Sequence, residues 1–530
     1  MFDYIVVGAG SAGCAVAGRL SEDASKKVLL LEAGPRDSNP MIHMPGGCAE
    51  VLKSKTLNWQ FYSEPQKNLN NRRIYVPRGR MLGGSSGANG MVYIRGHASD
   101  YDDWEKAGNP GWAFKDVLPY FRAMEDNVRG ANDFHGAGGP LYVADAPTPN
   151  ILYDKFIAAG AEIGIPPTDD FNGAQQEGMG RFQCTIKDGK RCSSAVAFLR
   201  PALGRPNLTV VTGAHVKRLI LKGDQVTGVE YLRGKSVQTA DLNNNGEVIL
   251  SAGAIQNPQI LQLSGIGHPD DLAAVGIKTQ IALPGVGHNL QEHLDVVMHF
   301  AATQPITMNG ITNSLVGQAK VALQYLFTKT GVAAGNGIEA GGFCRSDKSL
   351  TRPDIQLHFV PAYMTSLIEK LPKQHGVTVH ACKLRPESTG TVTVRSDNPL
   401  DAPKIDFNFL DKESDFVTLR KCFSILRELM AAKAWDGLIG DEITPGKQVQ
   451  SADDIDNAIR NITDSVYHPT STCKMGNGDD AVVNHQLKVH KVQGLRVADA
   501  SIMPNLIGGN TNVPAMMIGW KCAEMIKQGQ

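Results

Sequence analysis

A glycine-rich turn near the N-terminus constrains the fold more than any other feature. Phe2–Val7 is an apolar run with β-branched residues, which predicts a buried strand. The turn Gly8–Gly13 (Gly-Ala-Gly-Ser-Ala-Gly) comes next, and Ser11–Leu20 has the alanine-rich pattern of a helix. Lys27–Leu31 predicts a second buried strand, which ends in Glu32. A strand, a helix and a second strand in this order predict an α/β fold with a parallel, doubly wound sheet.

The same turn predicts a dinucleotide site. Gly8 permits the tight turn, Gly10 lets the backbone approach a pyrophosphate, and Gly13 lets the helix pack on the strand. The helix N-terminus supplies amide donors and a partial positive charge for the phosphates. Glu32 lies 19 residues after Gly13, where its carboxylate can accept hydrogen bonds from ribose hydroxyls. The candidate contacts in this part of the chain are Gly8, Gly10, Ser11, Ala12, Gly13, Glu32 and Ala33.

A second glycine-rich segment, Gly79–Tyr93, indicates which dinucleotide cofactor the chain binds. Its five glycines and two serines expose backbone amides over a long path, which suits a diphosphate and a flat ring lying along the chain and favours FAD over NAD. The alternative is a flexible loop. The apolar residues Leu82, Met91 and Val92 do not suit a flexible, solvent-exposed loop, so we favour a cofactor-binding segment.

Four further motifs complete the pattern, at Gly253–Gly267, Leu283–His293, Tyr467–Gly476 and Val497–Pro514. Together the six segments resemble the glucose–methanol–choline (GMC) family of FAD-dependent oxidoreductases, in order and over essentially the whole chain. The closest likeness is to bacterial alcohol dehydrogenases of alkane degraders. That closer likeness rests on Leu31–Asp37, Ile42–Pro45 and Tyr93–His97.

The resemblance implies a Rossmann-like FAD-binding domain built from discontinuous segments, 1–155, 195–298 and 462–530. A second α+β domain, 156–194 and 299–461, would bind substrate with an antiparallel sheet plus helices. Ala88 replaces the histidine that tethers FAD in some family members, so the resemblance implies non-covalent FAD. The other candidate cofactor contacts are Trp59, Arg80, Gly83, Gly84, Ser86, Asn89, Gly90, Met91, Val92, Val216, Ala252, Gly253, Tyr467, Asp499, Ala500, Asn510 and Thr511.

The resemblance gives His468 the role of catalytic base and Asn512 that of its partner. Alcohol oxidation removes a hydroxyl proton as well as a hydride, and a neutral histidine can take the proton near pH 7. Asn512 stands at the expected start of the last helix, where it can cap the helix or donate to a substrate oxygen. Four other histidines are interpreted as structural: His43, His97, His288 and His293.

The expected reaction is oxidation of medium-chain aliphatic or aromatic primary alcohols to aldehydes, with a quinone or O2 as electron acceptor. Choline oxidation, and use of O2 by an alcohol oxidase of this family, remain alternatives. A hydroxynitrile lyase on the same scaffold is more remote. So is a serine hydrolase, because Gly83–Gly87 formally matches G-x-S-x-G but lacks a good strand before it.

Composition argues against several other classes of protein. Lys and Arg total 53 and Asp and Glu total 53, which argues against nucleic acid as a partner. Nine scattered cysteines form no C-x-x-C pair, so we expect reduced thiols in a cytoplasmic protein and no metal site. No apolar run reaches the roughly 18 residues of a membrane span, and no signal peptide is expected. Peripheral attachment to the inner face of the cytoplasmic membrane, which a quinone acceptor would suit, stays open.

The remaining patterns predict more elements. We expect antiparallel strands at Leu208–Val211, Val216–Leu221 and Val226–Tyr231, and another strand from Gly246 to Ser251. Residues 35–75 look irregular. Further helices are expected at Asp116–Met124, Gly253–Leu263, Ser314–Phe327, Asp415–Ala432 and Pro514–Ile526. Further strands are expected at Ile355–Val360, Gly376–Leu384, Gly390–Arg395 and Leu495–Val497.

Overall fold

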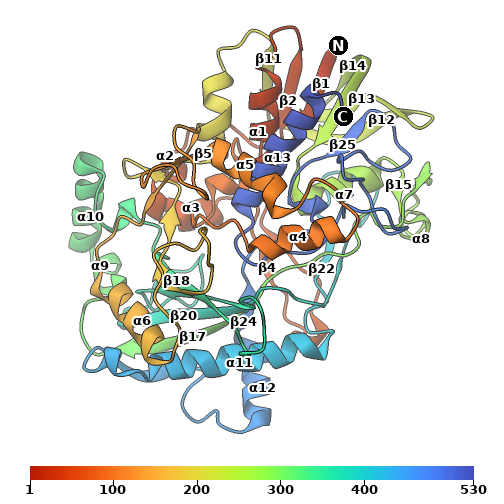
Figure 1. The fold of residues 1–530 in the computed structure, drawn as a ribbon. Coiled ribbons are helices and arrows are strands. Elements are labelled where there is room, and N and C mark those ends of the chain that lie inside the picture. Colours follow the sequence, from red (N-terminus) through yellow and green to blue (C-terminus); the bar gives the residue numbers. More distant parts are fainter.

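The computed structural model describes residues 1–530, apart from the side chain of residue 312. Two seven-stranded sheets organise the chain (Figure 1). The first has the order β11-β2-β1-β14-β13-β12, with β25 beside β14. Its strands are β11 (Leu208–Thr212), β2 (Val28–Glu32), β1 (Phe2–Val7), β14 (Ser236–Leu250), β13 (Gln225–Arg233), β12 (Ala214–Lys222) and β25 (Leu495–Val497).

Parallel pairing dominates one half of this sheet. β1 runs parallel to β2 and β14, β11 runs parallel to β2, and β25 runs parallel to β14. The strands β12, β13 and β14 pair antiparallel. The predicted α/β fold with a parallel sheet is therefore confirmed, and β1 and helix α1 (Ser11–Leu20) have the expected bounds.

Two expectations for this sheet were wrong. β11 is a parallel strand, with Leu208 opposite Val28, rather than the first of three antiparallel strands. It lies at the edge of the sheet and is only partly buried, so its alternating pattern imitated a half-buried antiparallel strand. β14 begins at Ser236 rather than at Gly246. The polar residues before Gly246 resemble a turn in sequence, but the strand continues through them with an irregularity at Asn245, which has a positive φ.

Three helices pack around the parallel sheet. α1 lies beside α13 (Asn512–Lys527), so the two ends of the chain are neighbours (Figure 1). The approach is close, since a Cβ atom on Gly519 would lie 2.4 Å from the carbonyl oxygen of Ala12. α7 (Gly253–Leu263) comes after β14 with the predicted bounds. The turns that join β1 to α1 and β14 to α7 are therefore neighbours, because β1 and β14 are paired in the sheet.

The second sheet is antiparallel, as predicted, with the order β23-β17-β20-β19-β18-β7 and β24 beside β17. Helix α11 (Glu413–Met430) lies beneath it in Figure 1 and buries Phe416, Leu419, Phe423 and Leu426 from one face. The strands are β23 (Ile439–Thr444), β17 (Leu294–Ala302), β20 (Gly376–Lys383), β19 (Ile355–Val360), β18 (Ala340–Cys344), β7 (Gly178–Arg181) and β24 (Thr463–Ser465).

The first residues of β17, 294–298, and all of β24 belong to the second sheet, although the expected segment boundaries place them with the FAD-binding domain. The boundaries themselves stay a prediction. β24 pairs with residues 294–296 of β17, so two segments expected in the FAD-binding domain join each other in the second sheet.

Shorter elements surround the two sheets. Residues 35–75 are less irregular than expected, because they contain two short helices. The remaining helices are α2 (Pro40–His43), α3 (Cys48–Lys53), α4 (Ala98–Lys106), α5 (Phe114–Met124), α6 (Ile151–Glu162), α8 (Pro269–Ala273), α9 (Met308–Thr312), α10 (Leu315–Thr328) and α12 (Ala452–Ile462). The short strands are β3 (Phe61–Tyr62), β4 (Tyr75–Val76), β5 (Glu125–Asn127), β6 (Leu141–Asp145), β8 (Gln183–Cys184), β9 (Ile186–Lys187), β10 (Lys190–Arg191), β15 (Ile266–Gly267), β16 (Ile281–Ala282), β21 (Thr391–Thr393) and β22 (Lys404–Asp406).

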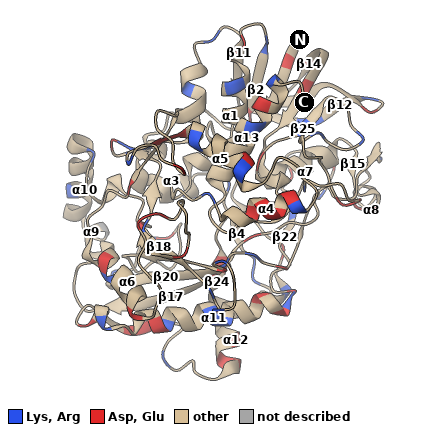
Figure 2. Ribbon diagram, viewed as in Figure 1, with Lys and Arg blue, Asp and Glu red and all other residues tan. Residues whose placement is uncertain are grey.

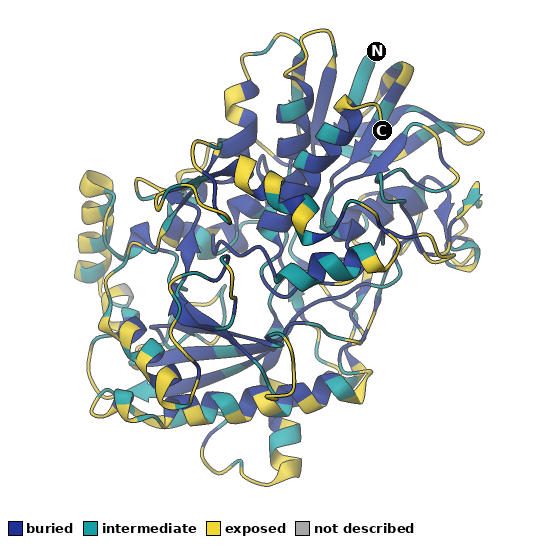
Figure 3. Ribbon diagram, in the orientation of Figure 1, coloured by how far each residue is buried: buried dark blue, intermediate teal, exposed yellow. Residues whose placement is uncertain are grey.

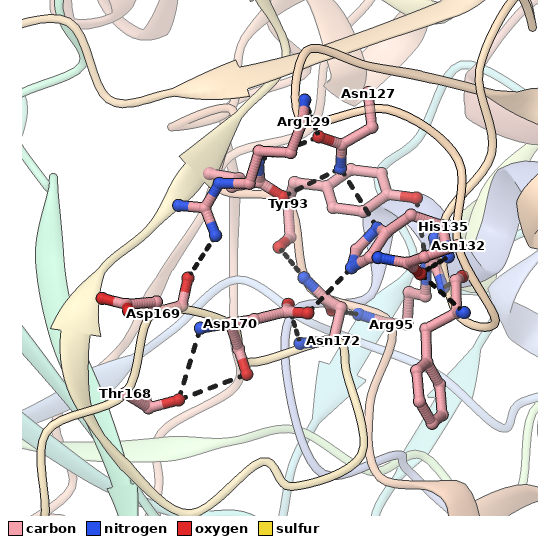
Figure 4. Close-up of polar contacts among 12 residues, drawn as sticks. Tyr93, Arg95, Asn127, Arg129, Asn132, His135, Thr168, Asp169, Asp170 and Asn172 are labelled. Atoms are coloured by element: carbon pink, nitrogen blue, oxygen red, sulfur yellow. Dashed lines mark hydrogen bonds and ion pairs between the residues drawn. The ribbon is translucent and has the colours of Figure 1, made fainter.

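A buried charged network supports the segment just after the second glycine motif. Arg95 pairs with Glu125 at 2.7 Å, and both side chains are almost fully buried. His135 Nδ1 lies 3.0 Å from Glu125 Oε1. His135 Nε2 lies 2.9 Å from Asp170 Oδ2 (Figure 4). Burial lowers the pKa of His135, but the hydrogen bonds to Asp170 and Glu125 outweigh it and raise the pKa to about 9. The protonated imidazole thus links three segments of the chain.

Among the residues that the structure describes, no helix combines the length and the apolarity needed to cross a membrane.

Candidate active site

A cavity of about 1230 Å³ reaches both sheets. Its volume exceeds the roughly 300–1,000 Å³ of ordinary small-molecule sites, which leaves room for a large cofactor and a substrate together. Most of the candidate residues line it: Gly8, Gly10, Ser11, Ala12, Glu32, Ala33, Trp59, Gly84, Asn89, Gly90, Met91, Val92, Val216, Ala252, Gly253, Tyr467, His468, Asp499, Ala500, Asn510, Thr511 and Asn512. Four do not line it: Gly13, Arg80, Gly83 and Ser86.

The first glycine turn packs closely at Gly8 and leaves open space beside the backbone at Gly10. Gly8 has a φ of +94°, and a Cβ atom there would lie 2.6 Å from the carbonyl oxygen of Ser251. A Cβ atom on Gly10 would meet only that same oxygen, at 3.8 Å. Gly84 approaches so closely that its own Cβ would lie 2.6 Å from the Cα atom of Gly10. The two glycine motifs therefore meet at the N-terminus of α1, where backbone amides can receive a pyrophosphate.

The Glu32 carboxylate is held in place for a cofactor. Its Oε2 accepts a hydrogen bond from the amide of Ala9 at 2.9 Å, and its Oε1 accepts one from the amide of Gly34 at 2.8 Å. Burial raises the pKa of Glu32 to about 7, against these hydrogen bonds and the charge of Arg80. A fixed carboxyl group at the cavity wall can accept from ribose hydroxyls, so the residues present fit a dinucleotide.

The candidates outside the cavity support the turn rather than line it. A Cβ atom on Gly13 would lie 1.8 Å from the Gly8 carbonyl oxygen, so this glycine permits close packing of helix on turn. The Gly83 amide donates to the Ala9 carbonyl at 2.7 Å, and Ser86 Oγ donates to the Gly83 carbonyl at 2.6 Å. The serine at the nucleophile position of the Gly83–Gly87 match is Ser85, which lies in a single helical turn with no strand directly before it, so it does not form the nucleophile elbow of a serine hydrolase.

Arg80 and Asp499 act at two other points of the cofactor region. The Arg80 guanidinium lies 4.8 Å from the centre of the Trp59 ring, and Trp59 lines the cavity. Asp499 Oδ2 accepts from the Gly253 amide at 2.6 Å and from Asn257 Nδ2 at 2.8 Å. Asp499 thereby fixes the start of α7 against the segment that enters α13.

His468 forms a pair with His293. The two Nδ1 atoms are 3.0 Å apart, and Nε2 of His293 is 2.9 Å from the carbonyl oxygen of Leu384. A carbonyl oxygen can only accept, so His293 Nε2 must carry a proton. In a neutral His293 the Nδ1 atom is then an acceptor, and Nδ1 of His468 must donate to it. The pair therefore leaves Nε2 of His468 without a proton, as a general base requires.

Electrostatics keeps both rings neutral. Burial lowers the pKa of His293 to about 4. Burial also lowers the pKa of His468 well below 6.5, with further lowering from His293, His358 and Arg78. Near pH 7 both imidazoles are neutral, which is the condition on which the tautomer assignment depends.

The structure places Asn510, rather than Asn512, against the base. Asn510 Nδ2 lies 3.3 Å from His468 Nε2, while its Oδ1 accepts a hydrogen bond from Gln356 Nε2 at 3.0 Å. Gln356 therefore sets which way the Asn510 amide faces. Asn512 Oδ1 instead accepts from Ser11 Oγ at 2.7 Å, so Asn512 lies at the first glycine turn. The sequence had marked Asn510 only as a cofactor contact.

A short antiparallel ladder brings the two histidines together. β24 pairs with β17, with Ser465 opposite Leu294, and a further bridge joins Gln291 to Thr470. His293 and His468 lie between these two pairings. The His468 amide also donates to Glu292 Oε1 at 2.7 Å. Backbone register therefore fixes how closely the two rings approach.

Sequence reasoning missed His293 because it interpreted this residue as structural, like three other histidines. The other three histidines have local partners: His97 caps α4, His43 Nε2 lies 2.6 Å from the Asp37 carbonyl oxygen, and His288 Nε2 lies 2.9 Å from Asp271 Oδ2. The available signal was the place of His293 at the end of the fourth motif, directly before the apolar run that forms β17. It could not show which distant segment would pair with that strand.

One cavity wall comes from the face of β17 and β20. Asp295, Val297 and His299 alternate along β17 and all line the cavity, as His380 does from β20. Asp295 Oδ2 accepts from His380 Nδ1 at 2.7 Å. Within the described residues, Asp295 Oδ1 is buried without a hydrogen-bond partner. No group of three or more His, Cys, Asp or Glu side chains in the described chain is arranged to hold a metal ion.

Comparison with family models matches the chain to GMC oxidoreductase, over residues 2–295 for the N-terminal model and 386–519 for the C-terminal model. The chain is 44% identical over 528 residues to an alcohol dehydrogenase [acceptor] of Pseudomonas putida, covering 99% of this chain and 96% of the relative. It is 43% identical over 526 residues to an oxygen-dependent choline dehydrogenase of Brucella anthropi, covering 99% and 95%.

Among solved structures, pyridoxine 4-oxidase from Mesorbium loti superposes with a TM-score of 0.90. It is 31% identical in sequence, and the match covers 100% of this chain and 99% of that one.

Proposed function

The chain belongs to the GMC oxidoreductase family of FAD-dependent flavoproteins, and from that premise we propose that it oxidises primary alcohols to aldehydes. The cofactor is FAD, which the first and second glycine motifs and Glu32 would hold. The observation that carries the proposal is the His293–His468 pair, since it leaves an unprotonated nitrogen beside Asn510 at the cavity.

Bound FAD supplies the hydride acceptor at its N5 atom. His468 Nε2 takes the proton of the substrate hydroxyl, and Asn510 Nδ2 donates a hydrogen bond to the same region, 3.3 Å from Nε2. His293 holds the proton on His468 Nδ1 throughout. Burial disfavours a charged His468, so the ring releases this proton to water after the reaction instead of retaining it.

We propose a medium-chain aliphatic or aromatic alcohol as substrate and a quinone as electron acceptor, with O2 as the alternative acceptor. Apolar side chains along the cavity support this substrate class: Val297, Val360, Ala362, Leu367 and Ile368. The name of the Pseudomonas putida relative supports an acceptor other than a nicotinamide.

Choline is the second candidate, because Asp295 places a carboxyl group in the cavity wall with one buried oxygen unpartnered among the described residues. Trp59, Tyr75 and Tyr467 also line the cavity, and aromatic faces attract quaternary ammonium groups. The name of the Brucella anthropi relative points the same way. If choline is the substrate, the substitution Asp295→Asn should lower kcat/KM for choline more than kcat/KM for a neutral alcohol.

Anaerobic mixing of the yellow holoenzyme with a panel of primary alcohols and choline tests the proposal. A substrate bleaches the flavin, and reoxidation by O2 or by a soluble quinone then identifies the acceptor. The matched control is His468→Gln, which should retain FAD and lose about 10²–10⁴-fold in the rate of bleaching. Failure of every alcohol to bleach the wild-type flavin contradicts the proposed function.

A further inference from the structure

Helix α10 projects from the molecule with no buried residue among those described. It packs mainly on its neighbours along the chain, α9 and the turn 332–334, and Tyr325 Oη donates a hydrogen bond to the Gly189 carbonyl at 3.0 Å. Figure 3 shows the helix mostly exposed. Its large apolar side chains stand in solvent: Leu315 is 84% exposed, Val316 79%, Phe327 78%, Leu326 63% and Leu323 54%. Exposed apolar surface of this kind marks an interaction site.

The exposed apolar residues form one stripe. At about 100° per residue, positions 315, 316, 319, 322, 323, 326 and 327 fall within an arc of about 140°, and all of them are apolar. The opposite side carries Gly317, Val321 and Tyr325, which are partly buried against the body of the protein. An ordinary surface helix turns its apolar stripe inward, whereas α10 turns it outward. We name these seven residues the α10 stripe.

The charged residues on α10 itself have one sign. The chain carries no acidic residue between Asp295 and Glu339, and the only charged residues on and just after the helix are Lys320 and Lys329. On the helical projection Lys320 lies at about 140°, at one edge of the stripe, while Lys329 follows the last helical residue as the C-cap, with its Nζ atom 4.5 Å from the centre of the Tyr325 ring. Figure 2 shows no acidic residue on α10. An apolar face on a helix whose only charges are basic is the pattern of a helix that lies in a membrane interface.

The α10 stripe lies near the cavity. Gln318, on the same helix, lines the cavity, as do Met308 of α9 and Val332 of the following turn. Leu367 and Ile368 line it from a neighbouring loop. A surface on which the stripe rests would therefore adjoin the cavity lining, and apolar molecules dissolved in that surface would be close to it.

We propose that the α10 stripe docks this protein peripherally on a phospholipid bilayer that carries anionic headgroups. The apolar arc enters the boundary between headgroups and acyl chains, and Lys320 and Lys329 contact the lipid phosphates. A second copy of the chain is a poorer occupant. A two-fold contact through the stripe would bring four lysines together with no acidic side chain on either helix. The proposal goes beyond the proposed reaction and does not depend on it.

Sedimentation of the holoenzyme with sucrose-loaded vesicles tests the proposal. We expect binding to vesicles of phosphatidylcholine with phosphatidylglycerol, and weaker binding to phosphatidylcholine alone. The double variant Leu323→Glu with Phe327→Glu should lower the partition coefficient at least about tenfold. The matched control, Leu400→Glu with Val237→Glu, changes two apolar residues that are 64% and 55% exposed elsewhere and should bind as the wild type does.

Two results would overturn the proposal. One is a wild-type holoenzyme that fails to bind the anionic vesicles. The other is a dimer in lipid-free sedimentation velocity that the double variant dissociates, since the stripe would then be a contact between copies. Thermal midpoint, FAD content and activity with a soluble acceptor verify that the double variant is folded. If it fails these checks, Lys320→Glu with Lys329→Glu decides, by losing the preference for anionic vesicles or keeping it.

Discussion

Removing the acceptor at position 293 should impair the base without touching the substrate. His293→Leu deletes the Nδ1 atom that receives the proton of His468 Nδ1 at 3.0 Å. His293→Asn keeps an oxygen at nearly the same place along the side chain, with the amide nitrogen on the side that faced Leu384. The leucine variant should therefore lose the tautomer that leaves His468 Nε2 unprotonated, and the asparagine variant should retain it.

The size of the loss can be worked from the buried N–H group. Without an acceptor, the Nδ1–H of His468 is buried and unsatisfied, which costs about 1–3 kcal/mol. The proton then shifts to Nε2, which faces the cavity, to the extent that this cost outweighs the opposing donor Asn510 Nδ2. An energy of this size lowers the population of the competent tautomer, and with it kcat/KM, by about 5- to 150-fold.

Stopped-flow flavin bleaching with the best alcohol measures this effect in wild type and both variants. FAD content and thermal midpoint, matched among the three proteins, show that the fold and the cofactor are retained. A merely structural role for His293 would lower stability in both variants without separating their rates. The tautomer argument is refuted if His293→Leu keeps the wild-type kcat/KM, or if His293→Asn is as damaging as His293→Leu.

Three other expectations concern pH and the glycine contact. Because burial and neighbouring histidines lower the pKa of His468, its loss of kcat/KM with acid should begin only below pH 6.5, and an inflection above 6.5 would contradict this. His135 has a pKa raised to about 9 in the folded protein against about 6.5 unfolded, so its stabilisation is complete below pH 6.5 and lost as the pH rises through about 9. At about 1.4 kcal/mol per pH unit this amounts to about 3 kcal/mol, and thermal midpoints of wild type and His135→Gln should converge over that range, while parallel curves would disprove it. Gly84→Val places a Cβ atom 2.6 Å from the first glycine turn at a φ of +51°, so FAD should be lost on dialysis. Gly204→Ala, with no atom within 4 Å of the added Cβ, should retain FAD, and equal retention by both variants would count against the contact.

Local sequence patterns predicted the elements well where each pattern has a single physical cause. β1, α1 and α7 have the expected bounds, because an apolar run, a glycine turn and an alanine-rich face each act over a few residues. β11 was misjudged, since an edge strand alternates in either pairing direction. The pairing of His293 with His468 could not be predicted, because it depends on the register of two segments 175 residues apart.

The partner of the base illustrates the same limit more sharply. Asn510 and Asn512 are two residues apart in one motif, and either could reach a cavity from the sequence alone. Helix α13 begins at Asn512, so that residue lies with the first turn and bonds to Ser11 of α1, against which α13 packs. Asn510 still lies in the preceding loop, where Gln356 of the second sheet turns its amide toward His468. The base and its partner are thus set by contacts from the second sheet, while the cofactor motifs belong to the first. A variant such as Gln356→Leu should therefore weaken alcohol oxidation through Asn510 and leave FAD content unchanged, and loss of FAD in that variant would show that the two sets of contacts are not separable.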